Sequence, residues 1–231
     1  MKPHKIFAIA LLLLIATSCS SEDNYSAPNQ TLKGAIYDLA TKGDAEEKMI
    51  PAQSPDGARI KLYEGSSTQA QIVWCRSDGS FTNTRLFADE YKLVPEGPFV
   101  VDETDIITTS IPTKENIKFY LEPYLRVELK GDLNREAKEV KFSFKINKSE
   151  QWNGRLNQFV VLYSTTSHVS VSAYTDRITT TIPANDESKF LNKELEATIS
   201  NIDPTKPIFI RIAAKSTGTD YFNYSEVVEV K

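Results

Sequence analysis

The sequence predicts an all-β protein made of two tandem β-sandwich domains. Apolar and polar side chains alternate in many short runs, such as Ala58 to Tyr63, which is the period of a strand with one buried face. Turn signals such as Asp78-Gly79 separate these runs. No run with the period and length of a helix lies between them. Short strands that follow one another in this way pack as sandwiches.

Residues 1–18 have the pattern of a secretory signal peptide. Lys2 and Lys5 give a positive start, an apolar run extends from Ile6 to Ile15, and small residues lead to Cys19. The apolar run is too short to cross a bilayer, which takes about 20 residues. The pattern therefore predicts export of the chain from the cytoplasm.

The cysteine that follows the small residues resembles the lipobox of bacterial lipoproteins. The resemblance implies cleavage before Cys19, a lipid on its thiol, and a tether over residues 19–29. A secreted protein with a free Cys19 and an uncleaved anchor are the alternatives. The stretch from Ser20 to Asp23 is similar to the export signal of Bacteroidetes surface lipoproteins. It implies an outer-membrane protein that faces outward, although acidic tethers also occur on the periplasmic side.

Composition excludes several functional classes. The chain has 27 Lys and Arg against 31 Asp and Glu, and loss of Lys2 and Lys5 leaves 25 against 31, a formal charge of −6. Nucleic acid is therefore not an expected partner. Cys75 is the second of two cysteines and His168 the second of two histidines, so no zinc site or intramolecular disulfide is predicted.

No catalytic or cofactor site is predicted either. The 9 glycines form no phosphate-binding loop. The acidic stretch Asp102 to Asp105 lacks the spacing of a calcium loop, and we interpret it as solvated. A hydrolase would need two facing carboxylates, which sequence does not place. We expect a protein that is not an enzyme and uses no cofactor or metal.

The first domain is predicted over residues 30–122. Its motifs resemble those of transthyretin-like, carboxypeptidase-regulatory-like domains, and they occur in the order of that family: Gly34 to Asp38, Gly57 to Leu62, Asp78 to Phe81 and Tyr91 to Pro95. The resemblance implies a β-sandwich that serves as a structural or binding module. Trp74 lies in one of the predicted strands, and we expect it in the core.

The second domain is predicted over residues 123–231, because Pro123 interrupts a strand and a new alternating run starts beyond it. Val140, Phe142, Phe144 and Ile146 share one predicted core face. Further strands are expected at 157–163, 169–174, 177–182 and 194–199. The passage from Ile199 to Lys215 and the run from Tyr224 to Val230 resemble fibronectin type III strands. The resemblance implies an immunoglobulin-like sandwich.

Together these features are similar to small Bacteroidetes lipoproteins associated with Sus-type glycan-uptake systems. The similarity implies a non-enzymatic accessory protein with a glycan ligand and an outer-membrane transporter as partner. The alternative is a structural spacer or adhesion module that contacts proteins through an edge strand. The candidate glycan-binding residues are aromatic residues in polar loops, namely Trp152, Tyr221 and Tyr224. A Trp152 that folds back over a sandwich edge is the alternative for that residue.

Overall fold

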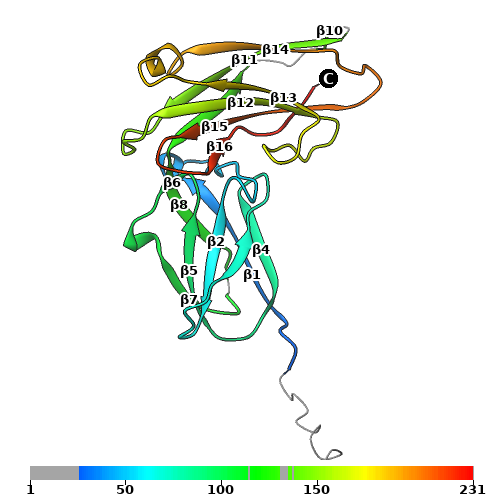
Figure 1. Ribbon diagram of the computed structural model, residues 1–231. Coiled ribbons are helices and arrows are strands. Elements are labelled where there is room, and N and C mark those ends of the chain that lie inside the picture. The colour runs from blue at the N-terminus through cyan, green and yellow to red at the C-terminus, as the bar shows by residue number, and fades with distance from the viewer. Residues whose placement is uncertain (1–25, 114, 131–134, 137, 231) are drawn as a thin grey trace, which may run out of the picture.

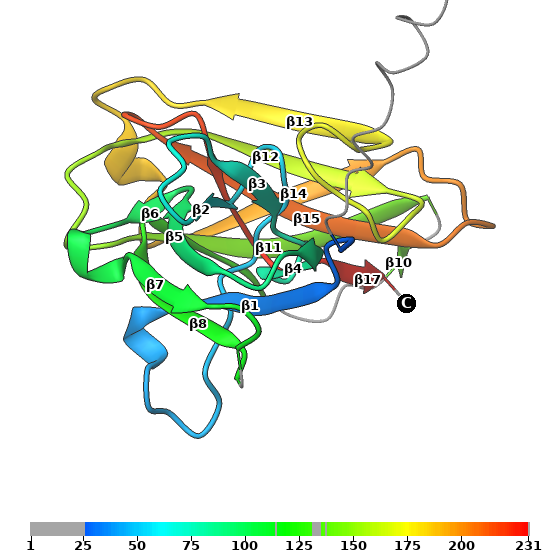
Figure 2. The same ribbon diagram turned by 90° about the horizontal axis from the view of Figure 1, so that it is seen from below.

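The computed structural model describes residues 26–113, 115–130, 135–136 and 138–230. It consists of strands, short 3₁₀ helices and loops, which confirms the predicted all-β class with two sandwiches. In Figure 1 the strands of the lower, N-terminal domain run vertically and those of the upper, C-terminal domain run crosswise to them. Figure 2 shows the two domains from below. No helix in these residue ranges is long and apolar enough to span a membrane.

The N-terminal domain is a sandwich of two four-stranded sheets. One sheet has the order β4-β1-β8-β6 and the other β3-β2-β5-β7. β1 pairs in parallel with β8 and antiparallel with β4. The strand bounds are β1 Gln30–Asp38, β2 Arg59–Glu64, β3 Gln71–Trp74, β4 Ser80–Leu86, β5 Glu90–Glu96, β6 Phe99–Val100, β7 Ile107–Ser110 and β8 Ile117–Pro123, and the 3₁₀ helices are η1 Leu39–Thr41 and η2 Glu103–Asp105.

Alternating residues of the two sheets form the core of this domain. The largest of them are fully buried, and include Ile36, Ile60, Phe81, Leu93 and Phe119. Gly79, at the predicted Asp-Gly turn, has a φ of 89°, which an L side chain adopts only with strain. The turn signal and the alternation are therefore both confirmed here.

The C-terminal domain packs a sheet of β9, β11 and β14, with β10 beside β11, on a second sheet of β13, β12 and β15 with β16 and β17. The predicted core face of β11 is confirmed, because Val140, Phe142, Phe144 and Ile146 are at most 7% exposed. The bounds are β9 Leu125–Lys130, β10 Arg135–Glu136, β11 Glu139–Lys148, β12 Leu156–Ser164, β13 Asp176–Thr181, η3 Glu187–Lys189, β14 Glu194–Ser200, β15 Ile208–Ser216, β16 Phe222–Tyr224 and β17 Val228–Val230.

The strand predicted at 169–174 was wrong. The segment is a loop closed by one bridge between Ser170 and Ala173. The Ser170 hydroxyl accepts a hydrogen bond from the Ser172 N–H at 3.3 Å. Serine side chains that bond to nearby backbone offer the chain an alternative to a sheet ladder, which explains the loop.

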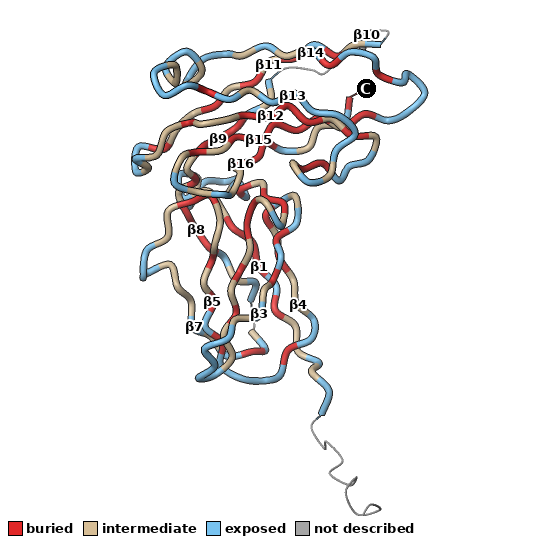
Figure 3. The backbone as a smooth tube through the Cα atoms, in the orientation of Figure 1, coloured by how far each residue is buried: buried red, intermediate tan, exposed pale blue. Residues whose placement is uncertain are grey.

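The central strands β12 and β15 of the second sheet of the C-terminal domain are buried on both faces. Ile210 and Ile212 point into the sandwich, whereas Arg211 and Ala213 point out of it, yet all four are fully buried. The outward side contains a separate apolar cluster with Val160, Leu162, Val169, Ala213 and Tyr224. Figure 3 shows this buried sheet directly above the N-terminal domain. The two domains are therefore packed against each other.

Arg211 fastens this contact. Its guanidinium donates to the carbonyls of Ala52 at 2.8 Å and Ser77 at 2.9 Å in the N-terminal domain. It also donates to Val169 and Ser225 in its own domain, and lies 4.2 Å from the ring centre of Tyr224. Burial lowers the pKa of Arg211 to about 10, so the group keeps its charge at neutral pH.

Candidate functional site

Trp74 is 49% exposed, the largest exposed fraction among the exposed large apolar side chains of the described residues. It is the last residue of β3, whose only strand partner there is β2. Its neighbours Val73 and Cys75 are buried, so the alternation of the strand turns Trp74 outward. The expectation that Trp74 is a core residue was wrong for this reason.

Two charged residues stand beside Trp74 on the same outward row of the sheet. Arg59 pairs with Trp74 on one side and with Glu96 on the other. The Arg59 Nη2 atom donates to Glu96 Oε1 at 2.8 Å, and the guanidinium carbon lies 5.9 Å from the Trp74 ring centre. Lys61, on the next outward row, lies with Nζ 2.6 Å from Glu96 Oε2.

The C-terminal domain adds a second aromatic ring to this row. Tyr221 lies just before β16, and its hydroxyl donates to Glu96 Oε1 at 2.6 Å. Its ring centre lies 5.9 Å from the Arg59 guanidinium carbon. Arg59 is thus flanked by Trp74 of one domain and Tyr221 of the other. We refer to Arg59, Lys61, Trp74, Glu96 and Tyr221 as the Trp74 face.

The carboxylate at the centre of the Trp74 face is held ionised. Partial burial acts to raise the pKa of Glu96, but hydrogen bonds from Arg59, Lys61 and Tyr221 outweigh it and lower the pKa to about 2. Burial and the bond to Glu96 raise the pKa of Tyr221 to about 12. Glu96 therefore carries no proton at neutral pH, and the chemistry offered is ring stacking and hydrogen bonding.

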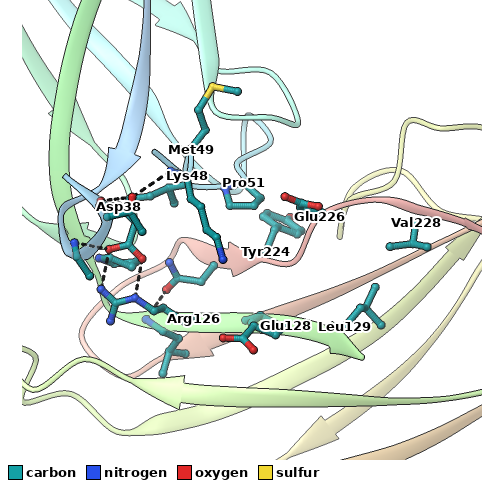
Figure 4. Close-up of a pocket in the computed structure, with 17 residues that line it drawn as sticks. Asp38, Lys48, Met49, Pro51, Arg126, Glu128, Leu129, Tyr224, Glu226 and Val228 are labelled. Carbon is teal, nitrogen blue, oxygen red and sulfur yellow. Dashed lines mark hydrogen bonds and ion pairs between the residues drawn. The ribbon is translucent and has the colours of Figure 1, made fainter. Parts of the chain in front are cut away.

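A groove of ≈ 480 Å³ lies elsewhere on the domain junction (Figure 4). Its lining comes from the η1 loop, the 48–51 segment, β9 and the 223–228 segment. Arg126 lies at one end of the groove. It donates two hydrogen bonds to the Asp38 carboxylate, at 2.6 and 2.7 Å, and one to Glu122 at 2.8 Å. The Lys48 side chain extends into the groove in Figure 4.

The groove has the size of a small-molecule site, for which about 300–1,000 Å³ is usual. Its one aromatic lining residue is Tyr224, which is 2% exposed. Arg126 is already neutralised by two carboxylates. The Trp74 face is therefore the stronger candidate for a ligand that stacks on an aromatic ring.

Comparison with protein-family models gives two matches. The model described as "Protein of unknown function (DUF3823) N-terminal domain" matches residues 30–121, and the model described as "Domain of unknown function (DUF3823_C)" matches residues 129–229. The chain belongs to the DUF3823 family. No curated protein matches it.

Solved structures of the DUF3823 family share the two-domain architecture. A family member from Bacteroides uniformis is 23% identical, with a TM-score of 0.74 over 88% of this chain and 99% of that chain. One from Parabacteroides merdae is 19% identical, with a TM-score of 0.70 over 89% and 100%. A "putative carbohydrate binding protein" from Bacteroides uniformis is 19% identical, with a TM-score of 0.66 over 88% and 99%. At these identities the likeness shows the fold.

Within this DUF3823 chain, Trp152 folds back over the sandwich edge. Its ring stacks on Tyr124 with centres 3.6 Å apart and an angle of 17° between the planes. Its Nε1 donates to Ser216 Oγ at 2.6 Å. The ring is half-buried. The structure therefore agrees with the alternative in which the Trp152 ring folds back over its own domain, and not with a ring that is open to a glycan.

The other two predicted aromatic residues, Tyr221 and Tyr224, differ in exposure. Tyr224 is 2% exposed, lies against Arg211, and accepts a hydrogen bond from the Val171 N–H at 3.3 Å. It is not available to a surface ligand, because the packing of the two domains covers it. Tyr221 is half-buried and belongs to the Trp74 face. The predicted loop thus supplies one of its two tyrosines to the candidate site.

Sequence reasoning missed Arg59 and Lys61, and placed Trp74 wrongly. Alternation places Val73 and Cys75 on one face of the strand and Ile72 and Trp74 on the other, but all four residues are apolar, so the sequence does not tell which face is buried. Nothing local links Glu96 to Tyr221, which are 125 residues apart. The described residues contain no cluster of three metal-ligating side chains, and Cys19 lies outside them.

Proposed function

We propose that this protein is a lipid-anchored surface protein that binds glycan through the Trp74 face. It acts without catalysis, as an accessory to an outer-membrane polysaccharide-uptake system. The observation that carries the proposal is the exposed Trp74 ring beside an ordered row of hydrogen-bonding groups. An indole face suits the apolar C–H face of a sugar, and charged and hydroxyl groups beside it suit the sugar hydroxyls.

Three further observations support this proposal. The lipobox-like Cys19 would anchor the chain at its N-terminus. Strand β1 begins at the end of the N-terminal domain opposite the C-terminal domain (Figure 1), so the junction and its Trp74 face would be held away from the membrane. The name of one structural relative, a "putative carbohydrate binding protein", points in the same direction.

A glycan-array screen followed by calorimetric titration of residues 20–231 tests the binding. We expect a glycan that binds the unchanged chain and binds Trp74→Ala at least tenfold more weakly. Phe87→Ala is the matched control, because Phe87 is another exposed aromatic residue of the same domain, at 42% exposure. Equal affinity of all three proteins would reject the Trp74 face, and no binding to any glycan would reject the function.

The anchor is tested separately in cells that express the full chain. Labelling with a fatty-acid analogue should mark the wild type and leave Cys19→Ala unmarked. Protease added to intact cells should then cleave the wild-type protein if it faces outward. A labelled Cys19→Ala protein would contradict the anchor, and protection from protease would contradict the outward face.

The second candidate function is a protein-interaction or spacer module, and β13 favours it. Among the described strands β13 pairs only with β12, which leaves its other edge open. Ile178 on β13 is 47% exposed and the nearby Tyr174 is 40% exposed. An open edge with apolar side chains is a surface for strand pairing. A photo-crosslinker at 178 that captures one specific protein, while one at 33 does not, would favour this function.

A further inference from the structure

The outward face of the sheet β3-β2-β5-β7 presents cations on three successive rows. The first row contains Trp74, Arg59 and Glu96, as described above. Ile72, Lys61 and Val94 form the second row. Tyr63, Lys92 and Thr108 form the third. These rows contain three cations and one carboxylate, whereas the chain as a whole is acidic.

The one carboxylate of the three rows is compensated in charge, and its second oxygen, Oε2, is buried and, apart from the ion pair with Lys61, has no hydrogen-bond partner among the described residues. Glu96 accepts from Arg59 and Tyr221 and is paired with Lys61, so its charge is compensated within the face. A second carboxylate, Glu90, lies beyond the third row at the start of β5, opposite Ser110. The centre of the face therefore has little acceptor capacity left for the hydroxyl groups of a ligand.

Donor groups on the face are in surplus. Arg59 donates to Glu96 through Nη2, whereas its Nε is buried and is not offered to a ligand. Lys92 is exposed, and it forms no ion pair with another described residue. The Trp74 indole adds an N–H. A surface rich in donors and cations and poor in acceptors is complementary to a ligand that carries anionic oxygens.

We propose that the Trp74 face binds an anionic glycan, whose charge is carried by uronic acid carboxylates or by sulfate esters. A sugar ring stacks on Trp74, and the acidic groups of the chain pair with the cations of the three rows, including Lys92. This inference rests on the proposed glycan-binding function and names its ligand class. It also accounts for Arg59, Lys61 and Lys92 on one face of an acidic protein.

Calorimetry of residues 20–231 with two matched pairs of ligands tests the inference. The first pair is oligogalacturonate and its fully methyl-esterified form, which keeps the backbone and loses the charge. The second pair is a sulfated galactan oligosaccharide and its desulfated form. We expect at least tenfold tighter binding of one charged form than of its neutral partner, with affinity falling as salt is added. The pair that shows the preference identifies the anionic group.

Two variants connect the preference to the face. Lys92→Gln should lower the affinity for the charged ligand by about threefold to fivefold, which is the effect of one exposed charge pair. The affinity for the neutral form should not change. Lys33→Gln, an exposed lysine on the other sheet, is the matched control and should change neither. Trp74→Ala should weaken both forms.

The outcomes separate the two proposals. Equal binding of charged and neutral forms, with both lost in Trp74→Ala, would overturn the anionic ligand and keep the glycan-binding function. Preference for the charged form that survives Trp74→Ala and Lys92→Gln would also overturn the inference, because the charge would then be read elsewhere. Absence of binding to these four ligands and to the whole glycan array would overturn both proposals.

Discussion

The two tryptophans of this protein differ in a way that local sequence does not foretell. Trp152 lies in a polar turn, yet its ring is stacked on Tyr124 and hydrogen-bonded to Ser216. Trp74 lies in an apolar run of a strand, yet half of it is open to solvent. The polarity of neighbouring residues therefore predicts exposure poorly. What decides is whether another part of the fold covers the ring.

The largest effect is expected from weakening the contact between the two domains, because Arg211 is fully buried there and donates to carbonyls of both domains. Arg211→Met would leave the carbonyl groups of Ala52, Val169 and Ser225 without this donor, and each such buried group costs about 1–3 kcal/mol. We expect a loss of at least about 3 kcal/mol in the free energy of unfolding, measured with denaturant. Arg177→Met, at an exposed arginine, should change it little. An Arg211→Met protein as stable as the wild type would show that the hydrogen bonds of Arg211 between the domains are dispensable.

A somewhat smaller loss is expected from Trp152→Ala. Removal of a buried tryptophan side chain costs about 3–5 kcal/mol, and Trp152 is only half-buried, so about 2–3 kcal/mol is expected. The stacked contact with Tyr124 and the bond to Ser216 are lost together. Denaturant unfolding measures the loss, and glycan binding should stay intact. A destabilisation below about 0.5 kcal/mol would mean that the ring is loosely held in solution.

Acid should weaken the Trp74 face before it affects the Trp152 contact. The folded pKa of Glu96 is about 2, below the ordinary value of 4.5, so its stabilisation is present above pH 4.5 and is lost as the pH falls toward 2. We expect about 1 kcal/mol from this group, since solvent screens a partly exposed carboxylate.

Glu96→Gln should therefore flatten the stability profile between pH 4.5 and pH 2, measured by thermal unfolding in a buffer series. Glu47→Gln is the matched control. Hydrogen bonds from Lys118 and Tyr120 likewise lower the pKa of Glu47 to about 2, but Glu47 lies outside the Trp74 face, so Glu47→Gln should leave glycan binding unchanged. If stability falls equally with pH in the wild type and in Glu96→Gln, the interactions of Glu96 with Arg59, Lys61 and Tyr221 do not stabilise the protein.

The smallest effect on stability is expected from Trp74→Ala. An exposed side chain away from the core changes the free energy of unfolding by about 0.5 kcal/mol or less. The same variant should show the largest effect on ligand binding, which is the reverse of Trp152→Ala. Calorimetry and denaturant unfolding on the same two preparations provide the comparison. A Trp74→Ala protein as unstable as Trp152→Ala would remove the contrast.

Sequence by itself determined the class of the fold and much of its core. The period of two along β11 places Val140, Phe142, Phe144 and Ile146 on one buried face, because successive side chains of a strand point to opposite sides. The Asp78-Gly79 turn follows from the conformational freedom of glycine in the same local way. These features depend on residues that are close in the chain.

Tertiary structure alone decided which aromatic residues are covered and which are open. Tyr224 is buried because the N-terminal domain packs on β15, through bonds such as Arg211 to Ala52 across 159 residues. Trp152 is hydrogen-bonded to Ser216, which is 64 residues away in the sequence, and Tyr221 to Glu96, which is 125 residues away. Such contacts form only when distant segments meet. The alternation within each strand records which way a side chain points, but not what it meets there.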